Sequence, residues 1–184
     1  MDEFAAPSLI IAMPQLIDPN FYRTVVLLVE KNDQGAFGLV INRSGEVSIP
    51  TLCSGLKIDW GGEPVARALF GGPVGTDQGF LLHGPVADDV VVNSKEVSSG
   101  IRIASDLETF RALCSRPPED FRILLGYAGW GPGQLEREMM AGAWLTCEVT
   151  PEIVFQTPLE EVWGRSLRGL GVDPTMLVHG GGMH

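Results

Sequence analysis

Apolar residues recur in short runs along the whole chain, and most of these runs have the length and composition of β-strands. Several are unbroken apolar stretches without alternation, which is typical of strands that are covered on both faces. The runs predict strands at 9–13, 25–29, 37–41, 68–70, 80–82, 90–92, 101–103, 123–125, 144–149 and 153–155.

Helical spacing of apolar residues is found mostly in the C-terminal half of the chain. The segments Ser105–Glu108 and Thr157–Glu160 each have the spacing of a capping box and precede an amphipathic stretch. Gly171 predicts the end of the second of these helices. Shorter helices are expected at 132–142, which begins with a proline, and at 50–55.

These elements predict an α+β fold, because strands and helices follow one another without a regular βαβ alternation. The 184 residues suffice for one domain spanning 1–184 with a substantial core, and no internal repeat or long linker divides them. Within this domain we expect residues 1–7 and 179–184 to be mobile.

The chain is acidic, with a net charge of −10, and its 45% of hydrophobic residues indicate a globular protein. Binding of DNA or RNA without sequence preference requires lysine and arginine to neutralise phosphates. The arginines at 102, 111, 116 and 122 are interleaved with acidic residues, which is typical of a solvated surface. We therefore expect no direct nucleic-acid partner.

The ends and the cysteines favour a cytoplasmic location. Residues 1–4 lack the layout of a signal peptide, and no apolar run approaches the roughly 20 residues that span a bilayer. Cys53, Cys114 and Cys147 are odd in number and form no C-x-x-C pair, which predicts reduced and mostly buried thiols.

Four glycines follow the apolar run at 123–125: Gly126, Gly129, Gly131 and Gly133. A strand, a glycine-rich loop and a helix start can together hold a phosphate, because free N–H groups and the helix dipole favour an anion. The spacing matches no nucleotide-binding motif, and Gln134 stands where a P-loop has lysine. Two interpretations stay open, a binding site and a tight packing corner.

Two arginines near predicted strand ends are further candidates. Arg23 precedes the strand at 25–29, and Asn42 and Arg43 follow the strand at 37–41. Arginine can bind a carboxylate or phosphate through two hydrogen bonds. The alternative is an internal pair of arginine and aspartate that connects the two strand ends.

His83 is the histidine best placed for chemistry, because imidazole titrates near neutral pH. The alternative is a structural histidine at a strand end. His179 and His184 flank a glycine-rich tail, and a zinc site would need distant carboxylates as well, so no metal is expected. The sequence contains no established enzyme motif and suggests no cofactor.

Taken together, these motifs resemble those of the bacterial AlgH/YqgE-like family. The matching segments are 9–14 with 18–23, 35–43, 71–74 with 79–83, and 126–136 with 144–145. The sequence departs from the family pattern at Thr24, Gln78 and Gly142, and the loss of a cation at Gln78 would weaken an anion site shared by the family. The resemblance implies a bent sheet forming an open pseudo-barrel with helices packed outside.

The resemblance implies little chemistry. The family is named for a genetic link to alginate regulation and is often labelled a transcriptional regulator, without an established mechanism. This chain has no visible helix-turn-helix with a basic recognition helix, so an effect on transcription would be indirect. We therefore expect a non-enzymatic binding or regulatory protein that acts through a protein or a small anionic molecule.

The expected binding site gathers polar and aromatic residues near the glycine loop: Arg23, Asn42, Arg43, His83, Trp130 and Gln134. Replacing Arg43 and Gln134 together by alanine should abolish binding without unfolding the chain. One alternative is an enzyme with His83 as acid or base and Asn42 or Gln134 stabilising an oxyanion. A strongly shifted pKa of His83 in a cleft would favour that alternative. A third, direct DNA binding, is disfavoured by the charge, and the oligomeric state is left open.

Overall fold

A computed structural model describes residues 4–179, with side chains through residue 177. The strands are β1 (Ser8–Ala12), β2 (Val25–Asn32), β3 (Gly35–Val40), β4 (Ser44–Ser48), β5 (Arg67–Phe70), β6 (Val74–His83), β7 (Lys95–Ser98), β8 (Ile101–Ala104), β9 (Phe121–Trp130) and β10 (Trp144–Cys147). The helices are α1 (Ile49–Gly55), α2 (Leu107–Ser115), α3 (Gln134–Met140), the π-helical turn η1 (Glu152–Gln156), α4 (Leu159–Gly169) and α5 (Pro174–His179).

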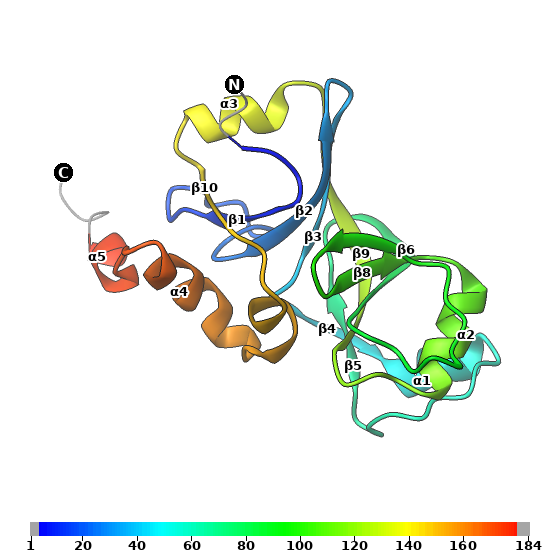
Figure 1. Cartoon of the computed structure of the whole chain (residues 1–184). Coiled ribbons are helices and arrows are strands. Elements are labelled where there is room, and N and C mark those ends of the chain that lie inside the picture. Colours follow the sequence, from blue (N-terminus) through cyan, green and yellow to red (C-terminus); the bar gives the residue numbers. More distant parts are fainter. Residues whose placement is uncertain (1–3, 180–184) are drawn as a thin grey trace.

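The strands form one 10-stranded sheet that bends around the long strand β9 (Figure 1). Its order is β10-β1-β2-β3-β9-β6-β8-β7, with β5 added beside β9 and β4 beside β5. The C-terminal part of β9 pairs with β3, and its N-terminal part pairs with β5 and β6. Every pairing is antiparallel except that of β5 with β9. The predicted fold, an α+β domain with an open pseudo-barrel, is confirmed.

The half of the sheet containing β1, β2, β3 and β10 is covered on both faces. Alternate residues of β1 point to opposite sides, because side chains alternate along a strand. Leu9 and Ile11 join a cluster with α4 and η1, and Ile10 and Ala12 join a second cluster with α3. Figure 1 shows α3 and α4 on opposite sides of this half. The unbroken apolar runs correctly predicted this double coverage.

The other half of the molecule has its own cluster beneath α1 and α2 (Figure 1). Phe110, Leu113 and Cys114 of α2 pack there with Ile49 and Cys53 of α1. The same cluster takes Leu81 from β6 and Ile123 from β9. Strand β9 therefore contributes to both halves and fixes how they are joined.

Two predicted strands are wrong. Residues 90–92 have no strand partner, and Val91 is 85% exposed, because the run lies in an irregular segment over the α2 cluster. Residues 153–155 form η1, since a short apolar run does not distinguish a strand from a buried helical turn. Two strands were missed, β4 and β7, whose residues are mostly polar.

The helices lie close to where they were expected, but neither predicted capping box exists. The cap of α2 is Asp106, whose Oδ2 accepts from the backbone N–H and the hydroxyl of Thr109, both at 2.9 Å. The α4 helix has no side-chain cap, because the Thr157 hydroxyl donates to the carbonyl of Glu152 instead. The short helix α5 was not predicted.

The ends of the chain are described in part. Phe4 and Ala6 pack against the α3 cluster, although they belong to the segment 1–7 that was expected to be mobile. Residues 1–3 and 180–184, including His184, lie outside the described residues. Within residues 4–179, no helix is both long enough and apolar enough to cross a membrane.

Candidate functional site

Asn42 connects the end of β3 to the chain just before β2. Its Oδ1 accepts from the backbone N–H of Val25, and its Nδ2 donates to the carbonyl of Arg23, both at 2.9 Å. Arg23 itself has a φ of 54° and places its guanidinium over the rings of Tyr22 and Trp163, at 5.3 and 5.2 Å. Asn42 is therefore engaged by backbone groups, and Arg23 is exposed between two aromatic rings.

Arg43 binds the same turn through its guanidinium. Nη1 donates to the carbonyls of Pro19 at 2.7 Å and Asn20 at 2.9 Å, and Nη2 donates to the carbonyl of Tyr22 at 2.9 Å. The two strand ends are thus connected internally, as the structural alternative required. The acceptors are main-chain carbonyls rather than the expected aspartate.

Trp130 belongs to an aromatic cluster built around one carboxylate. The rings of Phe21, Trp130 and Trp144 lie within 5.7–6.2 Å of one another, centroid to centroid. Oε2 of Glu138 accepts from Nε1 of Trp130 at 2.8 Å and from Nε1 of Trp144 at 3.1 Å. Both indole N–H groups are thereby satisfied inside the protein.

Gln134 closes the turn between β9 and α3. Its Oε1 accepts from the backbone N–H of Gly131 at 3.0 Å, and its Nε2 lies 3.4 Å from Oε1 of Glu138. Phe21 lies in the turn held by Arg43 and packs on Trp130, so this turn connects the strand-end residues with the aromatic cluster. Their polar groups are directed mainly to partners within the protein.

The predicted glycine loop is largely a strand. Gly126 and Gly129 lie within β9, and only Gly131 and Gly133 belong to the turn before α3. Gly126 has a φ of 78°, and a Cβ there would overlap the carbonyl oxygen of Gly72. The prediction of a loop is therefore wrong for its first half. Of the two interpretations, the close backbone crossing matches the packing corner.

A phosphate cradle is not formed at this turn. The Gly131 N–H that would face an anion is used by Gln134, and the following helix α3 has only seven residues. The nearest side chains include the carboxylate of Glu138, whose charge would repel a phosphate.

His83 is fully buried at the end of β6. Its Nδ1 lies 2.8 Å from the carbonyl oxygen of Gly84 and therefore donates to it, while Nε2 has no partner. Burial lowers the pKa of His83, the bond to Gly84 opposes this, and the nearby positive charge of Arg102 lowers it further. His83, Arg102 and Glu96 line a small cavity of about 170 Å³.

His83 lies at the opposite end of β9 from Trp130 and Gln134. It pairs with Phe121 at the start of β9, whereas Trp130 is at the other end of this strand. Nine residues of extended chain separate these two positions by up to about 30 Å. Gln134 follows the far end of β9, and the Asn42 amide is bonded to the backbone of Arg23 and Val25, so neither is available to stabilise an oxyanion beside His83.

Nucleophilic and metal-binding chemistry finds little support in the described residues. Burial raises the pKa of Cys114 to about 12 and that of Cys147 to about 11, and burial also raises the pKa of Cys53. None of the three thiols is in a disulfide, and Cys53 and Cys114 are buried. Across residues 4–177 no three His, Cys, Asp or Glu side chains gather as metal ligands.

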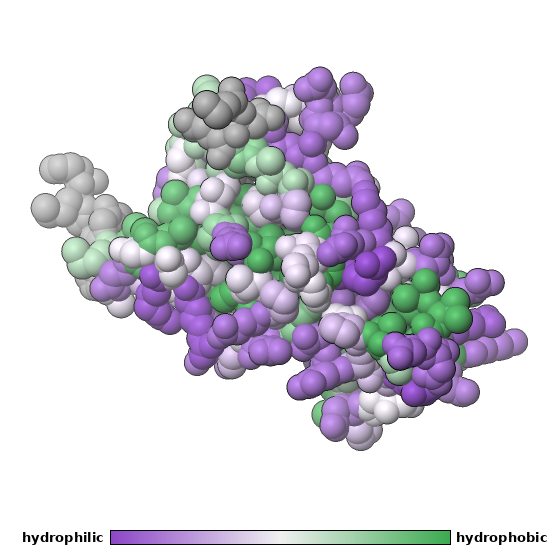
Figure 2. Space-filling view, in the orientation of Figure 1, coloured by the Kyte–Doolittle hydropathy of each residue, from purple (hydrophilic) through white to green (hydrophobic). Residues whose placement is uncertain are grey.

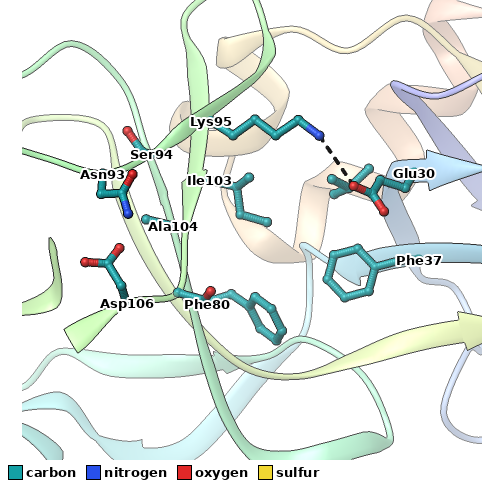
Figure 3. A pocket seen from close by; sticks show the side chains of 11 residues that line it. Glu30, Phe37, Phe80, Asn93, Ser94, Lys95, Ile103, Ala104 and Asp106 are labelled. Carbon is teal, nitrogen blue, oxygen red and sulfur yellow. Dashed lines mark hydrogen bonds and ion pairs between the residues drawn. The ribbon is translucent and has the colours of Figure 1, made fainter. Parts of the chain in front are cut away.

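A cleft of about 530 Å³ opens between the two halves of the sheet (Figure 3). We call it the seam cleft. Its apolar floor contains Phe37 of β3, Phe80 of β6 and Ile103 of β8, and the first two rings are 5.4 Å apart. These residues also pack on the α4 cluster, so the cleft reaches the interior of the pseudo-barrel.

The rim of the seam cleft is polar. Lys95 of β7 reaches across it to Glu30 of β2, with 3.4 Å between Nζ and Oε1, and both side chains are more than half exposed (Figure 3). Asn93 and Asp106 border the cleft on the β7 side. An apolar floor with a few polar groups around it is the usual composition of a binding pocket.

The family of the chain follows from its sequence as a whole. The profile of the AlgH-like family matches residues 9–175. The chain belongs to the AlgH-like family. The resemblance inferred from the motifs is therefore confirmed.

Relatives within the AlgH-like family carry names without a stated activity. A UPF0301 protein of Myxococcus xanthus is 44% identical over 181 residues, covering 97% of this chain and 98% of the relative. A UPF0301 protein of Cupriavidus pinatubonensis is 42% identical over 171 residues, covering 91% and 89%. The relatives thus support an AlgH-like protein without assigning an enzymatic or regulatory activity.

Solved structures confirm the AlgH-like fold. The solution structure of AlgH from Pseudomonas aeruginosa has a TM-score of 0.75 and 37% identity, and the alignment covers 100% of this chain and 98% of that one. A crystal structure of a Corynebacterium diphtheriae protein has a TM-score of 0.73 and 23% identity over 96% and 91% of the two chains. The second likeness concerns the fold alone.

The sequence predictions missed the seam cleft of this AlgH-like protein. Glu30 and Lys95 are ordinary surface charges in the sequence, and β7 contains a single apolar residue, Val97. The two charges are separated by 65 residues along the chain. Only the predicted strands at 37–41, 80–82 and 101–103, which supply the floor, indicated this region, and nothing in them pointed to an opening.

Proposed function

We propose that this protein is a non-enzymatic binding protein that holds a segment of a partner protein in the seam cleft. The main observation in support is that this cleft gives access to the interior of the barrel. Phe37, Phe80 and Ile103 line its floor beneath a rim of exposed charges. The polar groups at the aromatic cluster, in contrast, are engaged within the protein.

The charges at the rim favour a protein segment over a small anion. Glu30 and Asp106 are acidic and Lys95 is the cation that opposes them, so the cleft has an excess of negative charge. A phosphate or carboxylate metabolite would be repelled there. A peptide can place apolar side chains on the floor and bind the rim through its own amides.

Outside the seam cleft, the described residues form a second cleft of about 600 Å³ that contains Trp60 and Phe121, and the exposed large apolar side chains are scattered along the chain. The most exposed large apolar residues are Ile17, Val65, Val91 and Met140, each above 80% exposed and each in a different part of the chain. Figure 2 shows one gathered apolar patch on the part of the molecule that contains α2, and apolar residues mixed with polar ones over much of the rest of this face. Single exposed apolar residues of this kind are normal on soluble proteins.

An effect on transcription, as the label of the family suggests, would pass through this partner. The net charge of −10 opposes direct contact with DNA, because nonspecific DNA binding depends on neutralising phosphates. Protein binding in the cytoplasm is thus the form of regulation that we propose.

The test is affinity capture with a variant that fills the cleft. Asn93→Trp places an indole at the rim from an exposed position, and Ala87→Trp is the matched control in the same loop, facing a different cavity. We expect one partner to be retained by the wild type and the control and lost by Asn93→Trp. Equal retention by all three proteins would refute a binding role for the seam cleft.

A second candidate function is catalysis at His83. It is favoured by one observation, the lowered pKa of a buried histidine that borders a cavity. A thermal-shift screen against nucleotides, sugar phosphates and carboxylate metabolites tests it. A ligand at about 100 times its dissociation constant stabilises the fold by about 2.7 kcal/mol. A hit that disappears in His83→Phe supports this candidate, and hits independent of His83 argue against it.

A further inference from the structure

Two backbone edges of the sheet are open at the seam cleft. Strand β7 ends the sheet and pairs only with β8 among the described strands. On β2, pairing with β1 stops at Leu28, opposite Ser8, because the preceding Pro7 has no N–H to continue it. Beyond this point no described strand pairs with the outer edge of β2 at Val29 and Glu30.

The two open edges face each other. In the order β10-β1-β2-β3-β9-β6-β8-β7, the pairing of β1 with β2 stops at Leu28, so the strands from β2 to β7 curve into a barrel that is not closed between these two strands. The ion pair between Lys95 and Glu30 spans this gap through the full length of both side chains (Figure 3). Two strands with one strand missing between them lie about 9–10 Å apart, a distance that such a pair of side chains can bridge.

The floor beneath the gap is suited to the side chains of an added strand. Phe37 and Phe80 contact Tyr127 as well as each other, and Ile103 continues this apolar surface. Side chains of a strand alternate between its two faces, so every second residue of an inserted strand would contact the floor. The residues between them would face solvent beside Lys95 and Glu30.

We propose that an extended segment of the partner protein, with apolar residues at alternate positions, inserts as a strand between β2 and β7 and closes the barrel. This inference rests on the proposed function and specifies its mode of recognition. Main-chain hydrogen bonds to the two edges supply affinity, and the floor selects the alternating apolar side chains. The segment would cover the four residues of β7 on one side and Val29 and Glu30 of β2 on the other.

The exposed ion pair has a structural alternative. Charged side chains on edge strands prevent unwanted pairing between molecules, and Lys95 and Glu30 fit that role. The pair nevertheless costs little to displace, because exposed ion pairs contribute about 0–1 kcal/mol. The two charges can thus prevent pairing with unrelated strand edges and still be displaced by a segment whose alternating apolar side chains bind the floor of the cleft.

The test is amide hydrogen exchange on the whole protein with two synthetic peptides. The first is a capped peptide in which valine alternates with threonine and whose ends carry lysine. The second has the same side chains, but every backbone amide is N-methylated, so neither edge of the peptide can donate hydrogen bonds. At about ten times the dissociation constant, we expect the first peptide to slow exchange of outward-facing amides of β7 and of Val29 or Glu30 about tenfold. The second should leave these rates unchanged.

The outcomes separate this inference from the proposed function. Equal effects of the two peptides would overturn strand addition but keep a binding cleft that recognises side chains. If neither peptide protects these amides at about 1 mM, any dissociation constant would be weaker than that of a typical specific contact. This result would overturn strand addition at the seam. Capture of a partner that depends on Asn93 would still support the proposed function. Protection by the first peptide without such a partner would support an edge-binding seam and refute the proposed cellular role.

Discussion

The two ends of the shared sheet differ in how their polar groups are used. At the aromatic cluster, Glu138 accepts from both tryptophans, and Gln134 satisfies the Gly131 amide. At the seam cleft, two strand edges are open and a single exposed ion pair crosses the gap. The polar groups of the first region are paired within the protein, whereas the second leaves the strand edges at which we propose that a partner binds.

This difference shows how packing within the protein can account for the most distinctive motif of the sequence. The run of glycines and tryptophan at 126–133 is required by a backbone crossing at Gly72 and by the cluster around Glu138. Such packing restricts residue types as strictly as a binding site does. The seam cleft depends instead on where the strands end. Many different polar side chains can occupy such strand ends, so no distinctive motif marks the cleft in the sequence.

The largest effect is expected at the backbone crossing. Gly126→Ala must place a Cβ against the Gly72 carbonyl at a φ of 78°, so the free energy of unfolding should fall by at least about 3 kcal/mol. Gly129→Ala is the control in the same strand, where a Cβ meets only the ring of Tyr127 at 3.5 Å. Its cost should stay within about 1 kcal/mol in urea unfolding. Equal costs would show that the crossing is not the constraint.

The next effect concerns the carboxylate in the aromatic cluster. Glu138→Ala leaves the indole N–H groups of Trp130 and Trp144 without an acceptor and should cost about 2–3 kcal/mol. Glu138→Gln retains one oxygen and should cost less. Urea unfolding followed by tryptophan fluorescence measures both. A harmless alanine variant would contradict the described bonding.

The double variant Arg43→Ala, Gln134→Ala separates stability from binding. It removes the bonds to the turn at 19–22 and to Gly131, and we expect a loss of about 1–3 kcal/mol in unfolding free energy. The remaining folded protein should still retain the partner that Asn93→Trp loses. Loss of the partner by the folded double variant would return the binding site to the aromatic cluster.

The buried histidine predicts a pH dependence. The pKa of His83 is lowered in the folded state. At a pH between the ordinary value near 6.5 and this lower value, His83 is protonated in the unfolded chain but not in the folded protein. The stability is fully present above about pH 6.5 and falls as the pH drops below it. In His83→Leu this part of the decline should be absent. Parallel curves of wild type and variant from about pH 6.5 to 5.5 would contradict the assignment.

The smallest stability effect is expected at the ion pair. Lys95→Glu should change the unfolding free energy by less than about 1 kcal/mol, because both side chains are mostly exposed. Exchanging the charges, with Glu30→Lys and Lys95→Glu together, restores the pair and serves as the control. A large loss in Lys95→Glu that the exchange repairs would show that the pair holds the two halves together.

Much of the fold was predictable because its core strands are apolar throughout. The runs at 9–13 and 25–29 are buried on both faces, and the short helices at 50–55 and 132–142 were located correctly. Strands β4 and β7 were not predicted, since their polar residues lack the pattern of a strand. Residues 153–155 were assigned to a strand because three apolar residues fit either structure.

The candidate site was less predictable. Trp130 and Gln134 both contact Glu138, and Arg43 binds the turn that carries Phe21, so which of their polar groups are satisfied depends on Glu138 and on the carbonyls at 19–22, which the sequence does not show. His83 was grouped with them although the length of β9 separates it from Trp130. The seam arises where Pro7 ends the pairing of β1 with β2 and where the sheet curves, and this curvature is not encoded by single residues.

The most direct test of the account compares contact at the two regions in living cells. A photo-crosslinking amino acid is placed in turn at Asn93, on the seam cleft, and at Gln134, beside the aromatic cluster, both exposed positions. We predict a crosslinked partner protein from position 93 and none from position 134. A partner crosslinked from position 134 and absent from position 93 would contradict the claim that the seam is the binding region.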